Sequence, residues 1–482
     1  MGIWSLLTKK IERSPSREGP WPDDLEIARF GQDVFSLAEA KQGICIFGEN
    51  GSGKTSGSGR LFARKFLEKG FGGLVLCFKS GKDERDDDAK LWLRYLREMG
   101  RESDARIFSA TGDLRFNFLE YEARVSGPDF VDNLVTLLMD VASIGSRRGE
   151  SGVSDATYWA SAKEKMLRNA ITLLMLAKHP IKLRDIYRLI IDSPTSLAQS
   201  QDADWRRESF VFEMLSRASN RSGGHPEYDL IKDFWLRERA QLPDKTKATI
   251  EADITGMCDP LTRGKIGELL CTTTNISPDD IFDGKVVIID LPVAKYRKVG
   301  QHAALIWAQI FQRAVDRRQY AAPDTRPVFL WEDEAHWFTI DQDAMFQTTA
   351  RSKGICVVRL TQNLPNFLDA YGPNGRHKVE TLLGNHVFKI WHRNGDPTTN
   401  EWASKVIGKQ FKMKHSLSIG GTEKGKMSAS VSEEYQDSCP PHEFVGLANG
   451  GAANDCVVEG IIFQSGRLWQ DNRRWTVMKF RQ

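Results

Sequence analysis

The sequence predicts an α/β fold with a mostly parallel sheet and an all-α insertion, and three observations support this. Apolar runs typical of buried strands alternate with helix-like stretches in both the first and the last parts of the chain. A glycine-rich loop follows the first apolar run, residues 43–47, and precedes a helix-like stretch. Between about residues 124 and 262 strand signals are nearly absent, and apolar residues recur at helical spacing. Alternating strands and helices indicate an α/β sheet, and the purely helical stretch indicates an insertion.

The composition is that of an ordinary globular protein. With 482 residues, of which 40% are apolar and 27% charged, we expect roughly two to four domains. The 67 Lys and Arg residues nearly balance the 64 Asp and Glu residues, so net charge does not indicate nucleic-acid binding and any DNA site must be a local patch. The seven cysteines form no C-x-x-C pair, which favours reduced thiols in a cytosol.

Targeting segments are not evident in the sequence. No stretch approaches 18 consecutive apolar residues, so we expect no transmembrane helix. Residues 1–7 are too short an apolar stretch for a signal peptide. We expect a packed or disordered N-terminal arm, with a peripheral membrane anchor as the alternative.

The loop Gly48–Thr55 matches the pattern G-x-x-x-x-G-K-[ST] at every fixed position. Such a loop turns backbone N–H groups toward a polyphosphate, its lysine reaches the β- and γ-phosphates, and its hydroxyl holds Mg²⁺. ATP and Mg²⁺ are therefore the expected cofactors, with Lys54 on the phosphates and Thr55 on the metal. The expected nucleotide-binding residues are Gly48, Asn50, Gly51, Ser52, Gly53, Lys54, Thr55 and Ser56. The alternative, a glycine-rich turn that matches by chance, is disfavoured by the strand before the loop and the helix after it.

Four segments follow from these patterns. We predict an N-terminal arm at 1–40, a first part of the nucleotide-binding domain at 41–123, an all-α insertion at 124–262, and a second part of the nucleotide-binding domain at 263–482. Predicted strands lie at 73–78, near 107, and at 285–290, 328–331, 355–360 and 387–390. In the tail, 411–482, the alternating runs 416–419 and 427–431 predict an exposed hairpin.

An acidic run follows the strand-like residues 328–331. Because ligands lie at the carboxyl edge of such sheets, Asp333 is the predicted Mg²⁺ ligand and Glu334 the residue that orients or deprotonates water. Glu332 competes for either role, and a solvated acidic loop is the alternative reading. His336 completes an Asp-Glu-Ala-His string, which we treat as incidental.

Two further residues are candidates for catalysis. Gln362 follows the next predicted strand, where an amide can sense the γ-phosphate or orient water; the alternative is loop capping. Arg351 is a candidate for an arginine that stabilises transition-state charge on a neighbouring subunit's nucleotide. For Arg351 the alternative is an ordinary surface arginine.

These motifs together resemble the FtsK/HerA superfamily of ring-forming P-loop motor ATPases, and within it the TraG/TraD-type coupling proteins of conjugation and type IV secretion. The resemblance spans about residues 40–410 and is most specific in Ala350–Ile355, Thr361–Phe367, Tyr371-Gly372, Leu383–Asn385, Lys389-Ile390, Asp396 and Ile407-Gly408. Phe116–Leu119 and Asp155–Trp159 are weaker matches.

The resemblance implies a RecA-like ATPase domain, an all-α domain and a six-subunit ring around DNA. It implies that Lys54, Thr55, Asp333 and Glu334 hydrolyse ATP, that Gln362 is the sensor and that Arg351 acts across subunits. The expected function is a DNA-stimulated ATPase motor that moves DNA or a DNA–protein complex, with a protein cargo or secretion channel as further partner. The strand type is undecided, and no residue of a DNA channel is identified.

The sequence departs from this family in one feature. Members of the family usually carry N-terminal membrane helices, whereas no transmembrane helix is predicted here. We therefore expect a cytoplasmic protein, with peripheral attachment at the inner face of the bacterial membrane as a variant. Two alternatives remain: a soluble HerA/FtsK-like motor of a packaging, nuclease-partner or defence system, and a nucleotide-gated docking receptor. The runs 459–463 and 473–478 either complete the sheet or cap the ring.

Overall fold

The computed structural model describes residues 19–83, 86–125, 127, 130–143, 153–222, 224–373, 375–419 and 427–482. These residues form two compact units. Unit 1 contains the described parts of Phe71–Gln319 and Trp337–Gln342, and unit 2 contains those of residues 19–70, Tyr320–His336 and Asp343–Gln482. The first 18 residues, on which the packed-arm and anchor expectations depend, lie outside the described part of the chain.

Unit 2 is built on a mixed sheet whose central strands are parallel. In spatial order its strands are β13 (Trp475–Arg481), β12 (Val457–Gln464), β9 (Phe388–Trp391), β3 (Ile44–Phe47), β8 (Ile355–Thr361) and β7 (Val328–Glu332). The neighbours β9, β3, β8 and β7 pair in parallel, whereas β12 and β13 pair antiparallel. The two C-terminal runs therefore complete the sheet. All four β3 residues are buried, as expected for a parallel strand covered on both faces.

Alternation along β3 divides the core of unit 2 into two layers. Cys45 and Phe47 lie in one apolar cluster with residues of α18 (Leu364–Tyr371), α19 (Arg376–Gly384) and α20 (Pro397–Ile407). The opposite layer is aromatic. There Phe388 of β9 lies 6.0 Å, between ring centroids, from Phe62 of α2 (Arg60–Glu68) and 4.5 Å from Phe35. Both faces of the sheet are thus covered by apolar side chains. This packing holds the strands, and with them the strand ends, in place.

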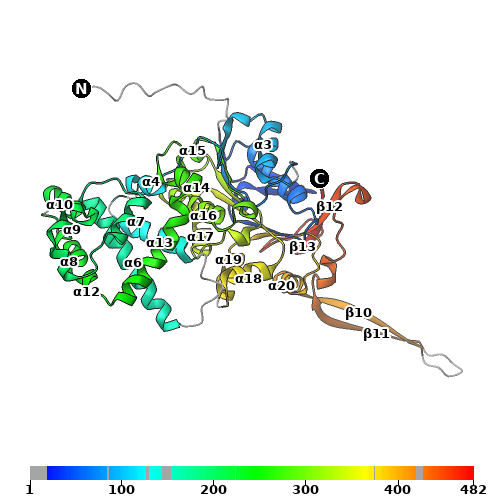
Figure 1. The fold of residues 1–482 in the computed structure, drawn as a ribbon. Coiled ribbons are helices and arrows are strands. Elements are labelled where there is room, and N and C mark those ends of the chain that lie inside the picture. Colours follow the sequence, from blue (N-terminus) through cyan, green and yellow to red (C-terminus); the bar gives the residue numbers. More distant parts are fainter. Residues whose placement is uncertain are drawn as a thin grey trace. The chain divides into compact units, whose positions relative to one another are not determined.

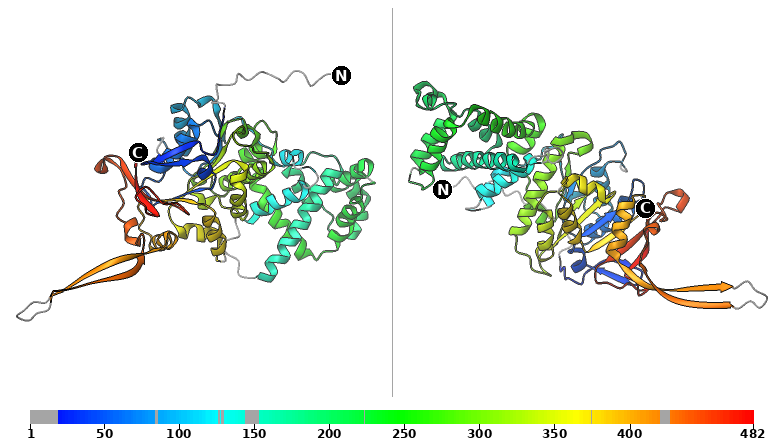
Figure 2. Two further views of the ribbon diagram at one scale, coloured as in Figure 1. Left: turned by 180° about the vertical axis from the view of Figure 1, so that it is seen from behind. Right: turned by 90° about the horizontal axis from the view of Figure 1, so that it is seen from below.

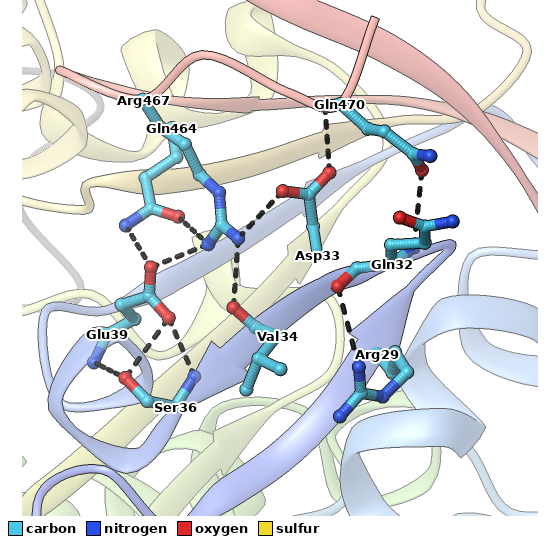
Figure 3. Close-up of polar contacts among 9 residues, drawn as sticks. All are labelled: Arg29, Gln32, Asp33, Val34, Ser36, Glu39, Gln464, Arg467 and Gln470. Atoms are coloured by element: carbon cyan, nitrogen blue, oxygen red, sulfur yellow. Dashed lines mark hydrogen bonds and ion pairs between the residues drawn. The ribbon is translucent and has the colours of Figure 1, made fainter.

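An unpredicted hairpin precedes the sheet. It consists of β1 (Glu26–Phe30) and β2 (Asp33–Ser36), followed by the short α1 (Leu37–Ala40). Arg467 fastens the C-terminal loop to this hairpin, because its guanidinium contacts Glu39, Asp33 and the carbonyl of Val34 (Figure 3). Residues 26–40 were predicted only as an arm, because their short strands carry no long periodic pattern.

Unit 1 contains a parallel three-stranded arrangement in the order β4 (Gly72–Leu76), β6 (Val286–Asp290), β5 (Ala105–Ser109). With unit 2, this confirms the predicted α/β class with mostly parallel strands. The remaining larger elements near these strands are α3 (Asp88–Glu98), α15 (Asp279–Phe282) and α16 (Val293–Arg317).

The described part of the stretch predicted as an insertion, 124–262, consists of helices joined by turns and contains no strand (Figure 2). Its helices are α5 (Phe130–Ser143), α6 (Val153–Leu176), α7 (Leu183–Ile191), α8 (Leu197–Gln201), α9 (Ala203–Glu208), α10 (Phe210–Ser222), α11 (Tyr228–Asp233), α12 (Arg239–Gln241) and α13 (Asp244–Thr262). The helix α4 (Phe118–Val125) enters this stretch, and α14 (Gly264–Cys271) follows it. The predicted domain boundaries themselves stay a prediction. Among the described helices, none is long and apolar enough to cross a membrane.

The predicted hairpin in the tail is present and longer than expected. Strands β10 (Lys409–Ile419) and β11 (Met427–Asp437) pair antiparallel from Lys409↔Asp437 to Ile419↔Met427. The ribbon extends beyond the other elements of unit 2 (Figures 1 and 2). Its predicted turn, residues 420–425, lies outside the described residues.

Candidate nucleotide-binding site

The phosphate-binding loop runs from the carboxyl end of β3 into the first turn that precedes α2. Gly51 and Gly53 have φ values of 74° and 84°, in the left-handed region that favours glycine. A Cβ added at Gly53 would also come within 2.5 Å of Val458 Cγ2. Both the backbone conformation and the lack of space therefore require glycine at this position. Ser52 Oγ is buried and has no hydrogen-bond partner among the described residues. Such an orphaned donor fits a phosphate oxygen, as the sequence predicts.

Thr55 and Asp333 meet as expected for a magnesium site. Thr55 Oγ1 donates a hydrogen bond of 2.9 Å to Asp333 Oδ2. The other carboxylate oxygen, Oδ1, accepts a 3.0 Å bond from the backbone N–H of Glu334. The two predicted metal ligands are 278 positions apart in sequence, and parallel pairing brings their strand ends to the same edge. A hydroxyl and a carboxylate side by side are the donor set that Mg²⁺ prefers.

Glu334 is the most constrained residue of the site. Its Oε1 lies 3.1 Å from Lys54 Nζ, and both side chains are almost completely buried. Gln362 Nε2 donates a 3.3 Å bond to the same oxygen, while Oε2 has no hydrogen bond among the described residues. The backbone of Glu334 has φ 55°, which costs a non-glycine residue about 1–3 kcal/mol. A strained, buried carboxylate with one oxygen that accepts no hydrogen bond is suited to accept a proton from water.

The remaining residues that the sequence singled out do not all lie against Glu334 or the Thr55–Asp333 pair. Asn50 is exposed, and Ser56 Oγ accepts a 2.8 Å bond from Gln482 Nε2. Arg351 is exposed on the 3₁₀ turn Arg351–Lys353. Its side chain makes no hydrogen bond or ion pair with the phosphate-binding loop in the described part of the chain. His336, which the sequence analysis set aside, lies 3.8 Å from Glu334 Oε2 through its Nδ1.

Sequence reasoning missed the residues at the end of β9. Arg393 Nε donates a 2.7 Å bond to Glu49 Oε1, and the backbone N–H of Gly395 donates 3.1 Å to Oε2. Asn394 Nδ2 donates to the carbonyl of Gln362 at 2.9 Å. The strand-end rule that selected Asp333 applies equally here, since residues 387–390 were already predicted as a parallel strand.

Glu332 is engaged in a buried ion pair and is not available to bind a metal ion or to act as a base. Arg359 Nε donates a 2.6 Å bond to Glu332 Oε2, and Arg359 Nη2 lies 3.0 Å from Asp343 Oδ1, with all three side chains buried. Burial raises the pKa of Glu332 to about 7, against the pull of Arg359 and with Asp343 adding to the rise. Burial disfavours the charge on Arg359, but Asp343 and Glu332 together hold its pKa above its ordinary value.

A buried, neutral histidine contacts the turn that follows the phosphate-binding loop. His392 Nδ1 donates a 2.8 Å bond to the carbonyl of Glu459, so Nε2 is free to accept from Ser58 Oγ at 2.7 Å. Burial, with a smaller effect from the charge of Lys54, lowers the pKa of His392 to about 4, although the hydrogen bond to the Glu459 carbonyl acts in the opposite direction. Protonation would turn the acceptor nitrogen into a donor facing a hydroxyl.

We expect the site to be acid-labile because of His392. In the unfolded chain the imidazole takes up its proton near pH 6.5, whereas the folded protein resists this until about pH 4. Stability is therefore full above pH 6.5 and falls as the pH is lowered, by about 2 kcal/mol at pH 5 from this residue. Thermal unfolding between pH 7 and pH 5 should show a smaller loss of midpoint in His392→Gln than in the wild type. Equal losses would contradict this assignment; any decline left in the variant is expected from His386, whose pKa burial also lowers.

Part of the chain matches a known protein family. Residues 327–447, which include Asp333, Glu334, Arg351 and Gln362, match the family described as the TraM recognition site of TraD and TraG. The chain resembles the TraG/TraD-type coupling proteins. No curated protein matches the chain.

Solved structures of the bacterial conjugative coupling protein TrwB share the fold. Unbound TrwB lacking its first 70 residues has a TM-score of 0.61 at 14% identity, covering 96% of this chain and 88% of that one. TrwB with ADP and Mg²⁺ has a TM-score of 0.60 at 14% identity, covering 96% and 89%. TrwB with a non-hydrolysable ATP analogue has a TM-score of 0.59 at 14% identity, covering 96% and 90%. The chain thus shares the fold of TrwB over nearly its whole length.

Proposed function

We propose that this chain is an ATP-hydrolysing motor that binds and moves DNA, acting as a coupling protein for conjugation or type IV secretion. The observation that carries the ATPase part is Glu334, held by Lys54 and Gln362 beside the Thr55–Asp333 pair. A protein that only bound nucleotide would need the loop and the metal ligands, but not a strained carboxylate with an oxygen that accepts no hydrogen bond at this position.

Each residue has a distinct part in the proposed reaction. Lys54 and the loop N–H groups bind the phosphates. Thr55 and Asp333 would hold Mg²⁺, which would supply positive charge against the negative charge that develops on the phosphates. Glu334 accepts the proton of the attacking water, and Gln362 orients Glu334 through its 3.3 Å hydrogen bond. Lys54 contacts Glu334 at 3.1 Å in this structure; phosphate would compete for the ammonium and release the carboxylate for water.

We propose that the working form is a ring, in which Arg351 of one subunit reaches the nucleotide of the next. Its exposure, and the lack of a contact with the phosphate-binding loop among the described residues, fit a residue that acts on a neighbour. A protein partner is also proposed, because the matched segment 327–447 is described in TraD and TraG as a recognition site for TraM. The proposed location is cytoplasmic, with attachment at the inner membrane through such a partner.

Magnesium-dependent ATP hydrolysis, measured with single-stranded DNA, with double-stranded DNA and without DNA, tests the motor. We expect DNA to stimulate hydrolysis several-fold and to favour a ring, read from the mass of the particles in the same samples. Stimulation by only one DNA type would identify the strand that is moved. Hydrolysis indifferent to both DNAs, from a protein that stays monomeric, would instead favour a nucleotide-gated docking receptor.

A further inference from the structure

A basic pocket lies beside the phosphate-binding loop, within unit 2. Its volume is about 550 Å³, and its walls come from β1 and the turn after it, from α2, and from the last strand, β13. Five cationic side chains line it, and none of its lining residues is a carboxylate. These cations are Arg29, Arg60, Arg64, Lys479 and Arg481.

Two of these cations have acidic partners outside the lining of the pocket. Arg29 pairs with Glu26 at the surface, and Lys479 Nζ lies 3.9 Å from Glu459 Oε1; exposed ion pairs of this kind are weak, so an anionic ligand can displace the carboxylates. Arg60 Nε is buried and has no hydrogen-bond partner among the described residues. Arg467, which lies in the neighbouring loop, shows the contrast, because two carboxylates and a carbonyl satisfy its guanidinium (Figure 3). The pocket therefore has an excess of positive charge that suits an anion.

The pocket extends toward a second cavity of about 270 Å³, with which it shares Phe30 and Met478. The cations stand on three separate elements and do not converge from one loop. A single phosphate would use only one part of such a surface, whereas a chain of phosphates would contact several parts.

The second cavity itself has no cationic lining residue and two carboxylates. Asp33 is engaged by Arg467 and by the N–H of Gln470, and Asp471 Oδ2 lies 3.8 Å from Arg473 Nε. The anion is therefore expected along the five cations of the first pocket.

The pocket is connected directly to the nucleotide site. Gln482, which follows β13 and lines the pocket, donates a 2.8 Å bond to Ser56 Oγ, next to the proposed metal ligand Thr55. Gly57 lines the same wall, and a Cβ added there would lie 3.3 Å from Phe480 Cβ. A ligand that moves β13 would therefore move the first turn after the phosphate-binding loop.

We propose that this pocket binds the phosphate backbone of a nucleic acid strand and transmits its binding to the ATPase site through β13 and Ser56. The proposal rests on the DNA motor function proposed above and names the site by which DNA would stimulate hydrolysis. Recognition is independent of base sequence, because the contacts are made by guanidinium and ammonium groups to phosphate.

The double variant Arg64→Glu with Arg481→Glu tests the pocket. Its control is Arg263→Glu with Arg376→Glu, which makes the same change of charge at side chains that are 74% and 77% exposed, outside the pocket. Binding of labelled single-stranded and double-stranded oligonucleotides is measured by fluorescence anisotropy over a salt series. We expect the pocket variant to bind about tenfold or more weakly, with a salt slope reduced by about two, and to lose stimulation of hydrolysis. The control keeps both.

The outcomes separate this proposal from the motor function. Wild-type protein that binds DNA and is stimulated by it, together with a pocket variant that behaves identically, overturns the pocket alone. Equal weakening in the pocket and control variants also overturns it, since the effect would then be one of net charge. Wild-type protein that neither binds nor responds to either DNA overturns both proposals. If the glutamate variant has a lowered thermal midpoint, Arg64→Gln with Arg481→Gln repeats the test with a smaller change of charge.

Discussion

Replacing Glu334 with Gln is expected to abolish ATP turnover while leaving nucleotide binding intact. The amide keeps the size of the side chain and can still contact Lys54, which lies 3.1 Å from the carboxylate, but it cannot accept a proton from water. General-base catalysis typically contributes a factor of about 10²–10⁴, so the rate constant kcat should fall by that factor. Single-turnover hydrolysis and binding of a fluorescent ATP analogue would measure the two effects separately.

Two companion variants make this result specific. Lys54→Ala should weaken binding of the analogue itself, because it removes the ammonium that contacts the phosphates. Glu401→Gln, an exposed position on α20, should leave both binding and turnover unchanged. Near-normal turnover by Glu334→Gln would transfer the role of base to another group and remove the main support for hydrolysis at this residue.

Replacing Arg359 with Met is expected to destabilise unit 2 strongly. The change leaves Glu332 and Asp343 buried without the guanidinium that contacts both of them. Removing one partner of a buried ion group typically costs about 3–5 kcal/mol. Glu332 immediately precedes Asp333, so the strand end that carries the proposed metal ligand should also loosen. Chemical denaturation and Mg²⁺-dependent nucleotide binding measure these two consequences.

Two controls define the cause of this loss. Arg376→Met breaks an ion pair at a side chain that is 77% exposed and should change the free energy of unfolding by less than about 1 kcal/mol. Adding Glu332→Gln and Asp343→Asn to Arg359→Met removes the buried charges and should restore part of the stability. If Arg359→Met unfolds like the exposed control, the buried ion group does not hold this strand end.

The sequence predicted the central strands well, because their signals are local. The strand-like runs at 285–290, 328–331, 355–360 and 387–390 correspond to β6, β7, β8 and β9, since buried parallel strands are continuous apolar runs. The short β1 and β2 were missed because neither has a long periodic pattern. The end of β9 was missed although it is a strand end, because no known motif drew attention to it.

The roles of the three acids at 332–334 depend on contacts with residues that are distant in the sequence. The sequence analysis assigned Asp333 to Mg²⁺ and Glu334 to water, and it left Glu332 as a competitor for either role. In the structure Glu332 turns into the core and binds Arg359, Asp333 meets Thr55, and Glu334 meets Lys54. Glu332 is the last residue of β7, whereas Asp333 and Glu334 lie in the turn that follows, where the backbone of Glu334 has φ 55°. The path of this turn therefore decides which group each acid faces.

The sequence by itself determined the phosphate-binding loop, the α/β class and the strand that ends in acids. Each of these depends on residues that are adjacent in the chain, where glycine conformation, strand length and side-chain chemistry act directly. Only the tertiary structure decided which carboxylate faces Lys54, and it alone gathered five cations from positions 29, 60, 64, 479 and 481 into one pocket. With a net charge of +3 spread over 482 residues, composition carries no trace of such a cluster, because its members become neighbours only when β1, α2 and β13 pack together.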